Sequence, residues 1–196
     1  MFRPLLLASS SRYRQSLLAR LQIPFEAVAP EVDETPLPGE SVAAMTVRLA
    51  AAKASALRAA YPAHLIIGSD QAASLDGRPL GKPGNGPAAL QQLLEMSGRT
   101  VVFHTAICLL DAATGHAETT EVPTRVVFRS LDPERIDHYL QREPAFDCAG
   151  SFKSEALGIA LCKEISATDP TALIGLPLIA LVSLLGNFGI EVPAPA

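Results

Sequence analysis

The sequence predicts one α/β domain built on a mixed, twisted sheet that is flanked by helices and has a waist between its two ends. Short apolar runs typical of buried strands alternate along the chain with segments whose apolar residues recur at helical spacing. The alternation contains neither an internal repeat nor a linker. The 196 residues are 48% hydrophobic and 18% charged, so the chain can bury a sizeable core. We expect residues 1–190 to form the domain and residues 191–196 to be a frayed tail.

In the first half of the chain, apolar runs predict strands and longer segments predict helices. The third expected strand ends at Ser69, Asp70 and Gln71. Ser41 is expected to cap a long helix that continues to about residue 60. Loops rich in proline, glycine and acidic residues separate these elements. The expected strands are residues 3–8, 24–28 and 64–68, and the other expected helices are residues 13–22 and 88–96.

The second half opens with two β-rich runs, residues 100–110 and 118–128, which predict a long hairpin. This hairpin is apolar enough either to complete the core or to form the contact of a homodimer. Asp132 and Pro133 are typical of the cap and the first position of a helix, so a helix is expected to begin there. The remaining expected elements are a short strand at residues 157–161 and a closing helix at residues 178–185.

The balance of charge and the apolar stretches exclude two classes of partner. Sixteen Lys and Arg residues against twenty Asp and Glu residues give a net charge of −4, and neither half of the chain is strongly basic. A sequence-independent nucleic-acid binder needs a basic surface, so no nucleic-acid partner is expected. The longest apolar stretch, residues 173–186, is shorter than the roughly twenty residues of a membrane span. It is also broken by Gly175 and Pro177, so no membrane partner is expected either.

The cysteines and histidines show no pattern typical of disulfides or metal sites. Cys108, Cys148 and Cys162 are odd in number and lack C-x-x-C spacing, so we expect buried thiols in a reducing compartment and a cytoplasmic protein. The four histidines are scattered without helical pairing, which argues against a histidine metal site or a His-based triad. Any metal would therefore be a hard cation on oxygen ligands, such as Mg²⁺.

The first candidate for chemistry is the segment SSSRYR at residues 9–14, which lies between an expected strand and an expected helix. Free backbone N–H groups at a helix N-terminus attract anions, and serine hydroxyls add further donors. Arg14 offers a planar fork that fits phosphate oxygens. The pattern indicates a phosphate site, and the alternative is an ordinary serine cap beside a solvated arginine.

Four other charged residues are candidates of different strength. Asp70 follows an expected buried strand, so its carboxylate would lie at the carboxyl edge of the sheet and could hold a cation or orient water. The alternative is a turn aspartate that caps the next segment. Lys82 lies in a G-K-P segment. The spacing of the glycines before Lys82 and the proline after it do not fit a Walker loop, but the lysine can still bind a phosphate as a point charge. Taken alone, Glu34 in an acidic loop and Lys53 in an alanine-rich helix suit a solvated surface.

Taken together and in order, these segments resemble the Maf family of nucleoside-triphosphate pyrophosphatases. The family pattern contains S-x-S-x-x-R, an acidic V-D-E loop, R-L-A-x-x-K-A, G-[SA]-D, G-K-P, A-G-S-F and a late G-L-P-L. An ordered series of short motifs is far more specific than any one of them. The matching segments are residues 9–14, 32–34, 48–54, 68–70, 81–83, 149–152 and 175–178.

The resemblance implies a fold, a reaction and a set of roles. The implied fold is a single Maf/ITPase-like domain in which two lobes enclose a cleft. The implied reaction is hydrolysis of a nucleoside triphosphate to its monophosphate and pyrophosphate with a divalent cation, Mg²⁺ or Mn²⁺. The implied roles are phosphate binding by Ser9, Ser11 and Arg14, neutralisation of charge by Lys53 and Lys82, metal binding by Glu34 and Asp70, and proton acceptance by Asp70.

Three residues concern the base of the substrate. Tyr13, Gln71 and Glu155 resemble the branch of the family that hydrolyses 7-methyl-GTP. A methylated guanine carries a positive charge, so it can stack on an aromatic face by cation–π attraction. A carboxylate such as Glu155 can accept hydrogen bonds from the guanine N1–H and amino group. The alternatives are the sister branch that acts on dTTP or UTP, and a non-catalytic role in nucleotide sensing or division control.

Overall fold

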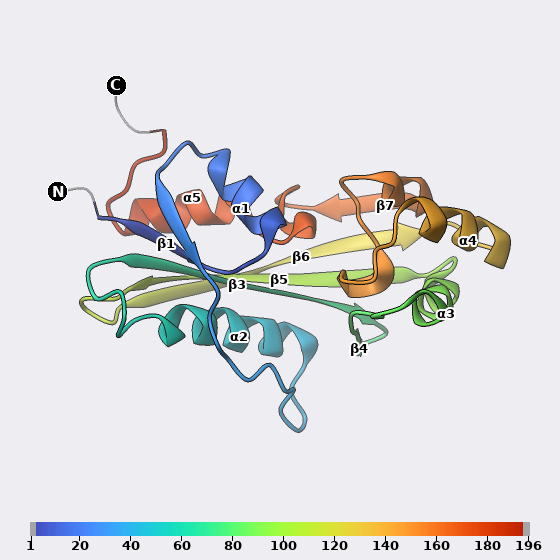
Figure 1. Cartoon of the computed structure of the whole chain (residues 1–196), viewed down its shortest axis with the longest axis horizontal. Helices are drawn as coiled ribbons and strands as arrows, with labels where there is room; N and C mark the ends of the chain where they lie inside the picture. Colours follow the sequence, from blue (N-terminus) through green and yellow to red (C-terminus); the bar gives the residue numbers. More distant parts are fainter. Residues whose placement is uncertain (1–2, 194–196) are drawn as a thin grey trace.

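A mixed sheet of seven strands runs the length of the molecule in the computed structural model, which describes residues 3–193 (Figure 1). The strand order is β2-β1-β3-β5-β6-β7, and β4 pairs with the end of β3. The strands are β1 (Leu5–Ala8), β2 (Phe25–Val28), β3 (Leu65–Leu75), β4 (Arg78–Leu80), β5 (Thr100–Asp111), β6 (Ala117–Phe128) and β7 (Cys162–Ala167). The helices are α1 (Arg12–Ala19), α2 (Val42–Ala56), α3 (Gly86–Met96), α4 (Pro133–Arg142) and α5 (Leu178–Asn187), with short 3-10 helices η1 (Ala149–Ser151), η2 (Leu157–Leu161) and η3 (Ala172–Ile174).

The sheet changes character along β3. β1 lies parallel to β2 and β3, whereas β5 pairs antiparallel with β3 and with β6. β1 ends where Ala8 pairs with Gly68, and β4 begins to pair only at Ala73. Residues 69–72 of β3 therefore have β5 on one side and, within the described part of the chain, no strand on the other. This gap in the strand edge is the waist that separates the two ends of the sheet.

Helices cover both faces of the sheet at the end that contains β1 and β2. α2 packs on one face, and α1 and α5 pack on the other (Figure 1). Along β1, Leu5 and Leu7 join the core under α1 and α5, whereas Leu6 and Ala8 join the core under α2. A strand buried on both faces is apolar at every position, which explains why this run reads as continuous apolar sequence. We call this end the first lobe.

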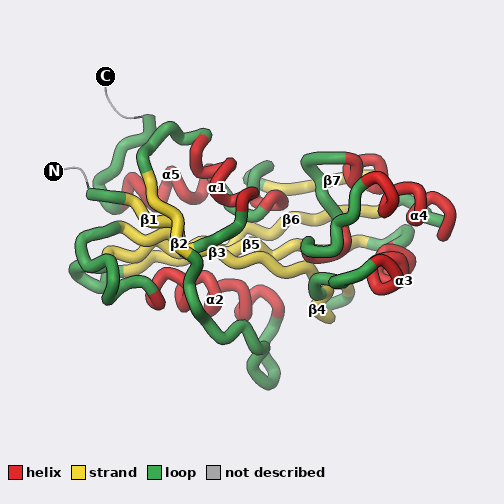
Figure 2. The backbone as a smooth tube through the Cα atoms, in the orientation of Figure 1, coloured by secondary structure: helices red, strands yellow, loops and turns green. Residues whose placement is uncertain are grey.

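The other end of the sheet, which we call the second lobe, has a separate core. α3, α4, β7 and the helices η1 and η2 surround it, and the long strands β3, β5 and β6 continue into it from the first lobe (Figure 2). Phe103, Phe128 and Phe152 meet in this core with ring centroids 5.3 to 6.0 Å apart. The two lobes therefore share one sheet but bury different side chains.

The structure confirms the expected α/β class, the hairpin and the order of most elements. The caps predicted at Ser41 and Asp132 are formed, because their side chains accept hydrogen bonds from the backbone N–H groups of Ala44 and Arg135. The hairpin of β5 and β6 lies in the middle of the sheet and completes the core of both lobes. α1 ends at Ala19 and α2 at Ala56, earlier than expected, whereas α3 and α5 each extend two residues beyond their expected bounds.

Three expectations about secondary structure and burial were wrong. β3 does not end before Ser69, because β5 pairs with it continuously from residue 65 to residue 74 and keeps the polar segment extended. Residues 157–161 form the 3-10 helix η2 rather than a strand, and the strand β7 begins only at Cys162. Cys108 and Cys162 are buried, but Cys148 is only half-buried.

At the C-terminal end, Val192 packs against the core under α1 and α5, and residues 194–196 of the expected tail lie outside the described residues. None of the described helices is long and apolar enough to cross a membrane.

Candidate active site

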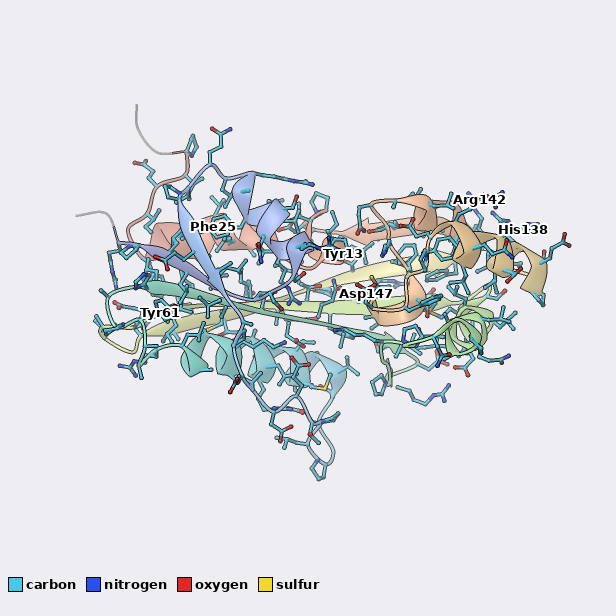
Figure 3. The ribbon with its side chains drawn as sticks, viewed as in Figure 1. Tyr13, Phe25, Tyr61, His138, Arg142 and Asp147 are labelled. Carbon is cyan, nitrogen blue, oxygen red and sulfur yellow. The ribbon has the colours of Figure 1, made fainter. Side chains whose placement is uncertain are left out.

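A cavity of about 560 Å³ opens at the waist and has walls from both lobes. A smaller recess of about 390 Å³ surrounds the N-terminus of α1, and we call it the α1 recess. The two share several lining residues, so they form one continuous site. Tyr13 and Asp147, which line both, lie at the waist (Figure 3). The other shared residues are Ser11, Arg14, Glu34, Lys53 and Lys82.

The serine-rich segment builds the N-terminus of α1. Ser11 is its N-cap and accepts a hydrogen bond of 3.4 Å from the backbone N–H of Arg14. The buried Ser9 hydroxyl accepts hydrogen bonds from the backbone N–H of Ser11, at 3.1 Å, and from the Arg14 guanidinium, at 3.4 Å. The helix therefore presents donors and its positive end to the α1 recess, as expected for an anion site.

Lys53 joins the two acidic residues of the site. Its Nζ lies 2.6 Å from Asp70 Oδ1 and 2.6 Å from Glu34 Oε1. Lys53 and Asp70 are each only 7% exposed, whereas Glu34 reaches in from an exposed loop. The hydrogen bond from Lys53 lowers the pKa of Glu34, and the positive charges of Lys82 and Arg14 act in the same direction. The cluster therefore places two carboxyl groups within hydrogen-bond distance of one amine at the wall of a cavity.

A glycine determines how closely α2 approaches this cluster. A Cβ atom on Gly68 would lie 2.1 Å from the carbonyl oxygen of Ala50 and 2.8 Å from the amide nitrogen of Ala54. The helix backbone therefore rests directly on β3 at this point, which only glycine allows. This close packing brings Lys53 of α2 onto Asp70, two residues further along β3.

Arg14 is fixed by a turn from the far end of the chain. Its Nε donates to the Gly175 carbonyl oxygen at 2.9 Å, and the buried Ser69 hydroxyl donates to the same oxygen at 3.0 Å. Burial lowers the pKa of Arg14, while the negative charges of Asp70 and Glu34 raise it. The guanidinium remains a cation because an arginine does not lose its proton in proteins.

The side-chain amide of Gln71 is held by neighbouring groups at the cavity wall. Its Nε2 lies 2.9 Å from Thr105 Oγ1, 2.9 Å from the Ala172 carbonyl oxygen and 3.0 Å from the Leu173 carbonyl oxygen. The amide nitrogen thus holds η3 against β3 and β5. Gln71 also lines the cavity.

The other predicted residues meet at the same cavity. Tyr13 comes from α1, Lys82 from the loop before α3, and Glu155 from the exposed segment before η2. The ammonium of Lys153 lies 6.0 Å from the centroid of the Tyr13 ring. Every residue named from the sequence therefore contributes to the site, with Ser9 in the α1 recess.

Sequence reasoning missed the residue that fixes the start of α5. Asp169 is 2% exposed and accepts hydrogen bonds of 2.7 Å from the Thr171 hydroxyl and from the backbone N–H of Ile179. It thereby satisfies the N-terminus of α5, and Thr171 accepts from the Leu178 N–H at 2.8 Å. No local pattern marked it, because Asp169 reaches the N–H of Ile179 from ten residues earlier and the residue directly before α5 is Pro177.

The carboxylates of the site suit a metal ion whose other ligands are water molecules and substrate phosphates. Among residues 3–193, no group of three or more His, Cys, Asp or Glu side chains is close enough together to hold a metal ion. Glu34 and Asp70 supply two carboxylates at one point, because both contact Lys53. Mg²⁺ is commonly bound by one or two carboxylates together with substrate phosphates and water, so these residues fit such an ion.

Comparison with known proteins shows similarity over almost the whole chain. The family described as Maf-like protein matches residues 4–188. A protein of Ralstonia nicotianae named 7-methyl-GTP pyrophosphatase is 55% identical over 184 residues, which are 94% of this chain and 95% of that protein. Proteins of the same name from Bordetella pertussis and Thiobacillus denitrificans are 52% and 53% identical, and the matches cover 95% and 96% of this chain and 93% and 94% of theirs.

Proposed function

This chain belongs to the Maf family, and from that premise we propose that it hydrolyses 7-methyl-GTP to 7-methyl-GMP and pyrophosphate. The observation that carries the proposal is the position of Lys53, whose ammonium lies 2.6 Å from both Glu34 and Asp70 at the wall of the cavity. A site that only bound nucleotides would not need a buried carboxylate beside a lysine. The names of the similar proteins support the choice of substrate.

The triphosphate is placed with its oxygens over the N-terminus of α1. Ser9, Ser11 and the free backbone N–H groups of the helix donate hydrogen bonds, and Arg14 supplies a planar fork that its bond to Gly175 keeps in one orientation. Lys53 and Lys82 neutralise the charge that develops on the departing pyrophosphate. Because hydrogen bonds and ion pairs already hold Arg14 and Lys53, these two cations need little reorganisation during the reaction.

Asp70 is assigned the role of proton acceptor for the water that attacks the α-phosphorus. Its Oδ1 is held by Lys53 at 2.6 Å, and its other oxygen has no hydrogen-bond partner among the described residues, which leaves it available for a water proton. Glu34 and Asp70 would hold the divalent cation, Mg²⁺ or Mn²⁺. When bound, the cation neutralises phosphate oxygens and favours attack at phosphorus.

At the other end of the substrate, Tyr13 and Glu155 are assigned to the base. The Tyr13 ring offers a face on which the positively charged 7-methylguanine can stack. The Glu155 carboxylate can accept hydrogen bonds from the guanine N1–H and amino group. Both residues line the same cavity as Asp70, which supports a single bound nucleotide that spans the waist.

The assignment of the base catalyst is tested by Asp70→Asn. A positioned general base contributes about 10²–10⁴-fold, so we expect kcat for pyrophosphate release to fall by roughly that factor while far-UV circular dichroism is unchanged. Asp137→Asn, on the exposed face of α4, is the matched control and should retain the parent rate. An Asp70→Asn enzyme that hydrolyses at nearly the parent rate would show that the base is another group.

The substrate is tested by measuring pyrophosphate release with Mg²⁺ from 7-methyl-GTP, GTP, dTTP, UTP and CTP side by side. We expect the largest kcat/KM for 7-methyl-GTP. A preference for dTTP or UTP would contradict the roles of Tyr13 and Glu155 while leaving the phosphate chemistry intact. Binding without turnover of any of the five would contradict the enzymatic proposal and favour a nucleotide-sensing role.

A further inference from the structure

Charged side chains of both signs line the site. Arg14, Lys53 and Lys82 line both the α1 recess and the main cavity, and Lys53 pairs with the carboxylates of Glu34 and Asp70. Between residues 147 and 155 of the second lobe, the charged residues that line the cavity are acidic, and we call this part the acidic wall. It contains Asp147 and Glu155, and behind them Glu143 faces the ammonium of Lys153 at 3.9 Å.

Asp147 is the carboxylate of this acidic wall that the catalytic proposal leaves without a role. It lines both the main cavity and the α1 recess, so it lies where the two join. No Lys, Arg or His nitrogen among the described residues lies within 4.0 Å of it, and its hydrogen-bond partner there is the Cys148 thiol at 3.5 Å. Burial, together with the charge of Asp147, raises the pKa of Cys148 to about 12, so the thiol stays protonated and neutral. The negative charge of Asp147 is therefore not cancelled by a direct ion pair.

The ring of Tyr13, which lines the cavity together with Asp147, already has a cation near it. The Lys153 ammonium lies 6.0 Å from the centroid of the Tyr13 ring, within the range of cation–π attraction. Lys153 does not belong to the residues found to line the cavity, whereas Tyr13 and Asp147 do. The Tyr13 ring thus already lies near one positive charge, and the part of the ring that lines the cavity is open to a ligand.

Resting on the proposed function, we propose that Asp147 is a specificity-determining residue that selects the positive charge of the 7-methylguanine base. Its carboxylate attracts a cationic base and repels the triphosphate, so it also fixes which end of the nucleotide enters each end of the site. Glu155 adds to this field, and Lys153 opposes it. A neutral guanine would gain the stacking contact with Tyr13 but not the attraction to Asp147.

The test separates charge from shape by means of a neutral analogue. In 7-methyl-7-deaza-GTP a carbon atom replaces N7, so the methyl group keeps its place while the positive charge is lost. The measured quantity is the ratio of kcat/KM for 7-methyl-GTP to kcat/KM for this analogue. For an exposed carboxylate in a partly aqueous cavity, we expect Asp147→Asn to lower the ratio about three- to tenfold. Lys153→Met should raise the ratio, and Asp137→Asn should leave it unchanged.

A change of opposite sign in the two variants would not follow from a loss of packing, because both substrates share one shape. An Asp147→Asn ratio equal to that of the parent enzyme, or a Lys153→Met ratio that falls, would overturn the proposal. If the parent enzyme turns over neither compound, the proposed function is wrong. The ratio of the two dissociation constants, measured by calorimetry without metal, would then test Asp147 by the same criteria.

Discussion

Replacing Gly68 by alanine perturbs the contact that brings together Lys53 and Asp70, the groups proposed to act in catalysis. The added Cβ would lie 2.1 Å from the Ala50 carbonyl oxygen and 2.8 Å from the Ala54 amide nitrogen. Both are backbone atoms of α2, so no rotation of a side chain can relieve the overlap. The same helix carries Lys53, whose ammonium lies 2.6 Å from Asp70. The substitution therefore acts on stability and on the geometry of the site through one displacement.

The size of that displacement follows from the contact distance. A Cβ atom essentially never approaches another heavy atom more closely than 3.0 Å, so the 2.1 Å contact must lengthen by roughly 0.9 Å. Overpacking of this kind costs about 1–3 kcal/mol, and we expect the upper end because backbone must move. For a domain of this size, about 3 kcal/mol corresponds to a fall in Tm of roughly 6–12 °C. A misplacement of about 1 Å in catalytic groups can cost about 10²-fold in rate.

Thermal melting followed by far-UV circular dichroism measures the first effect, and pyrophosphate release at 25 °C, where the variant remains folded, measures the second. Gly186→Ala is the matched control, because Gly186 lies within α5 and a Cβ there meets nothing within 4 Å. That control should keep its activity and gain about 0.5–1 kcal/mol of stability from its helical position. A Gly68→Ala protein with the parent Tm and the parent rate would refute the reasoning.

Two changes outside the cavity test its framework. Asp169→Ala removes the buried acceptor at the start of α5, so we expect a loss of about 1–3 kcal/mol in melting experiments. Pyrophosphate release should also fall, because the adjoining turn holds Gly175 against Arg14; an unchanged rate would show that this turn does not depend on Asp169. The hydrogen bond from Arg3 lowers the pKa of Asp111, so the folded chain holds this proton less readily than the unfolded chain. The resulting stability is present above the ordinary aspartate pKa of about 4 and is lost as the pH falls below it. Between about pH 4.5 and pH 2.5, the Tm of the parent should therefore decline more steeply than the Tm of Asp111→Asn. Parallel curves of Tm against pH would contradict this assignment.

The residues that gather at the cavity could be named from the sequence, whereas the contacts that hold them there could not. Ser11 and Asp70 lie in short local segments that combine a charged or hydroxyl side chain with an expected helix start or strand end, whereas Lys53 is indicated only by the ordered family motifs. The position of Asp70 inside β3 depends on β5, a strand that begins thirty residues later and pairs with the whole segment. Aspartate and serine have low strand propensity, so local reasoning places a turn there, and the pairing of the two strands overrides it.

Contacts between distant segments account for the remaining differences. Gln71 reaches the carbonyl oxygens of Ala172 and Leu173, and Arg14 reaches that of Gly175, across more than one hundred residues of chain. No local periodicity reports such a contact, because it depends on the path by which the C-terminal segment returns to the sheet. The contact of Asp169 with the Ile179 N–H likewise depends on the turn that separates them by ten residues.

The continuity of β3, β5 and β6 through both lobes has a consequence for how the molecule unfolds. Each strand gives its neighbour an uninterrupted ladder of hydrogen bonds across the waist, so loss of one lobe would leave the other with unpaired strands. The lobes are therefore expected to melt in a single cooperative transition, although their cores are separate. Amide hydrogens in the middle of β5 should exchange most slowly of all, because only global unfolding exposes them. A substitution that destabilises the acidic wall is then expected to destabilise the phosphate-binding residues as well, because both depend on the shared strands.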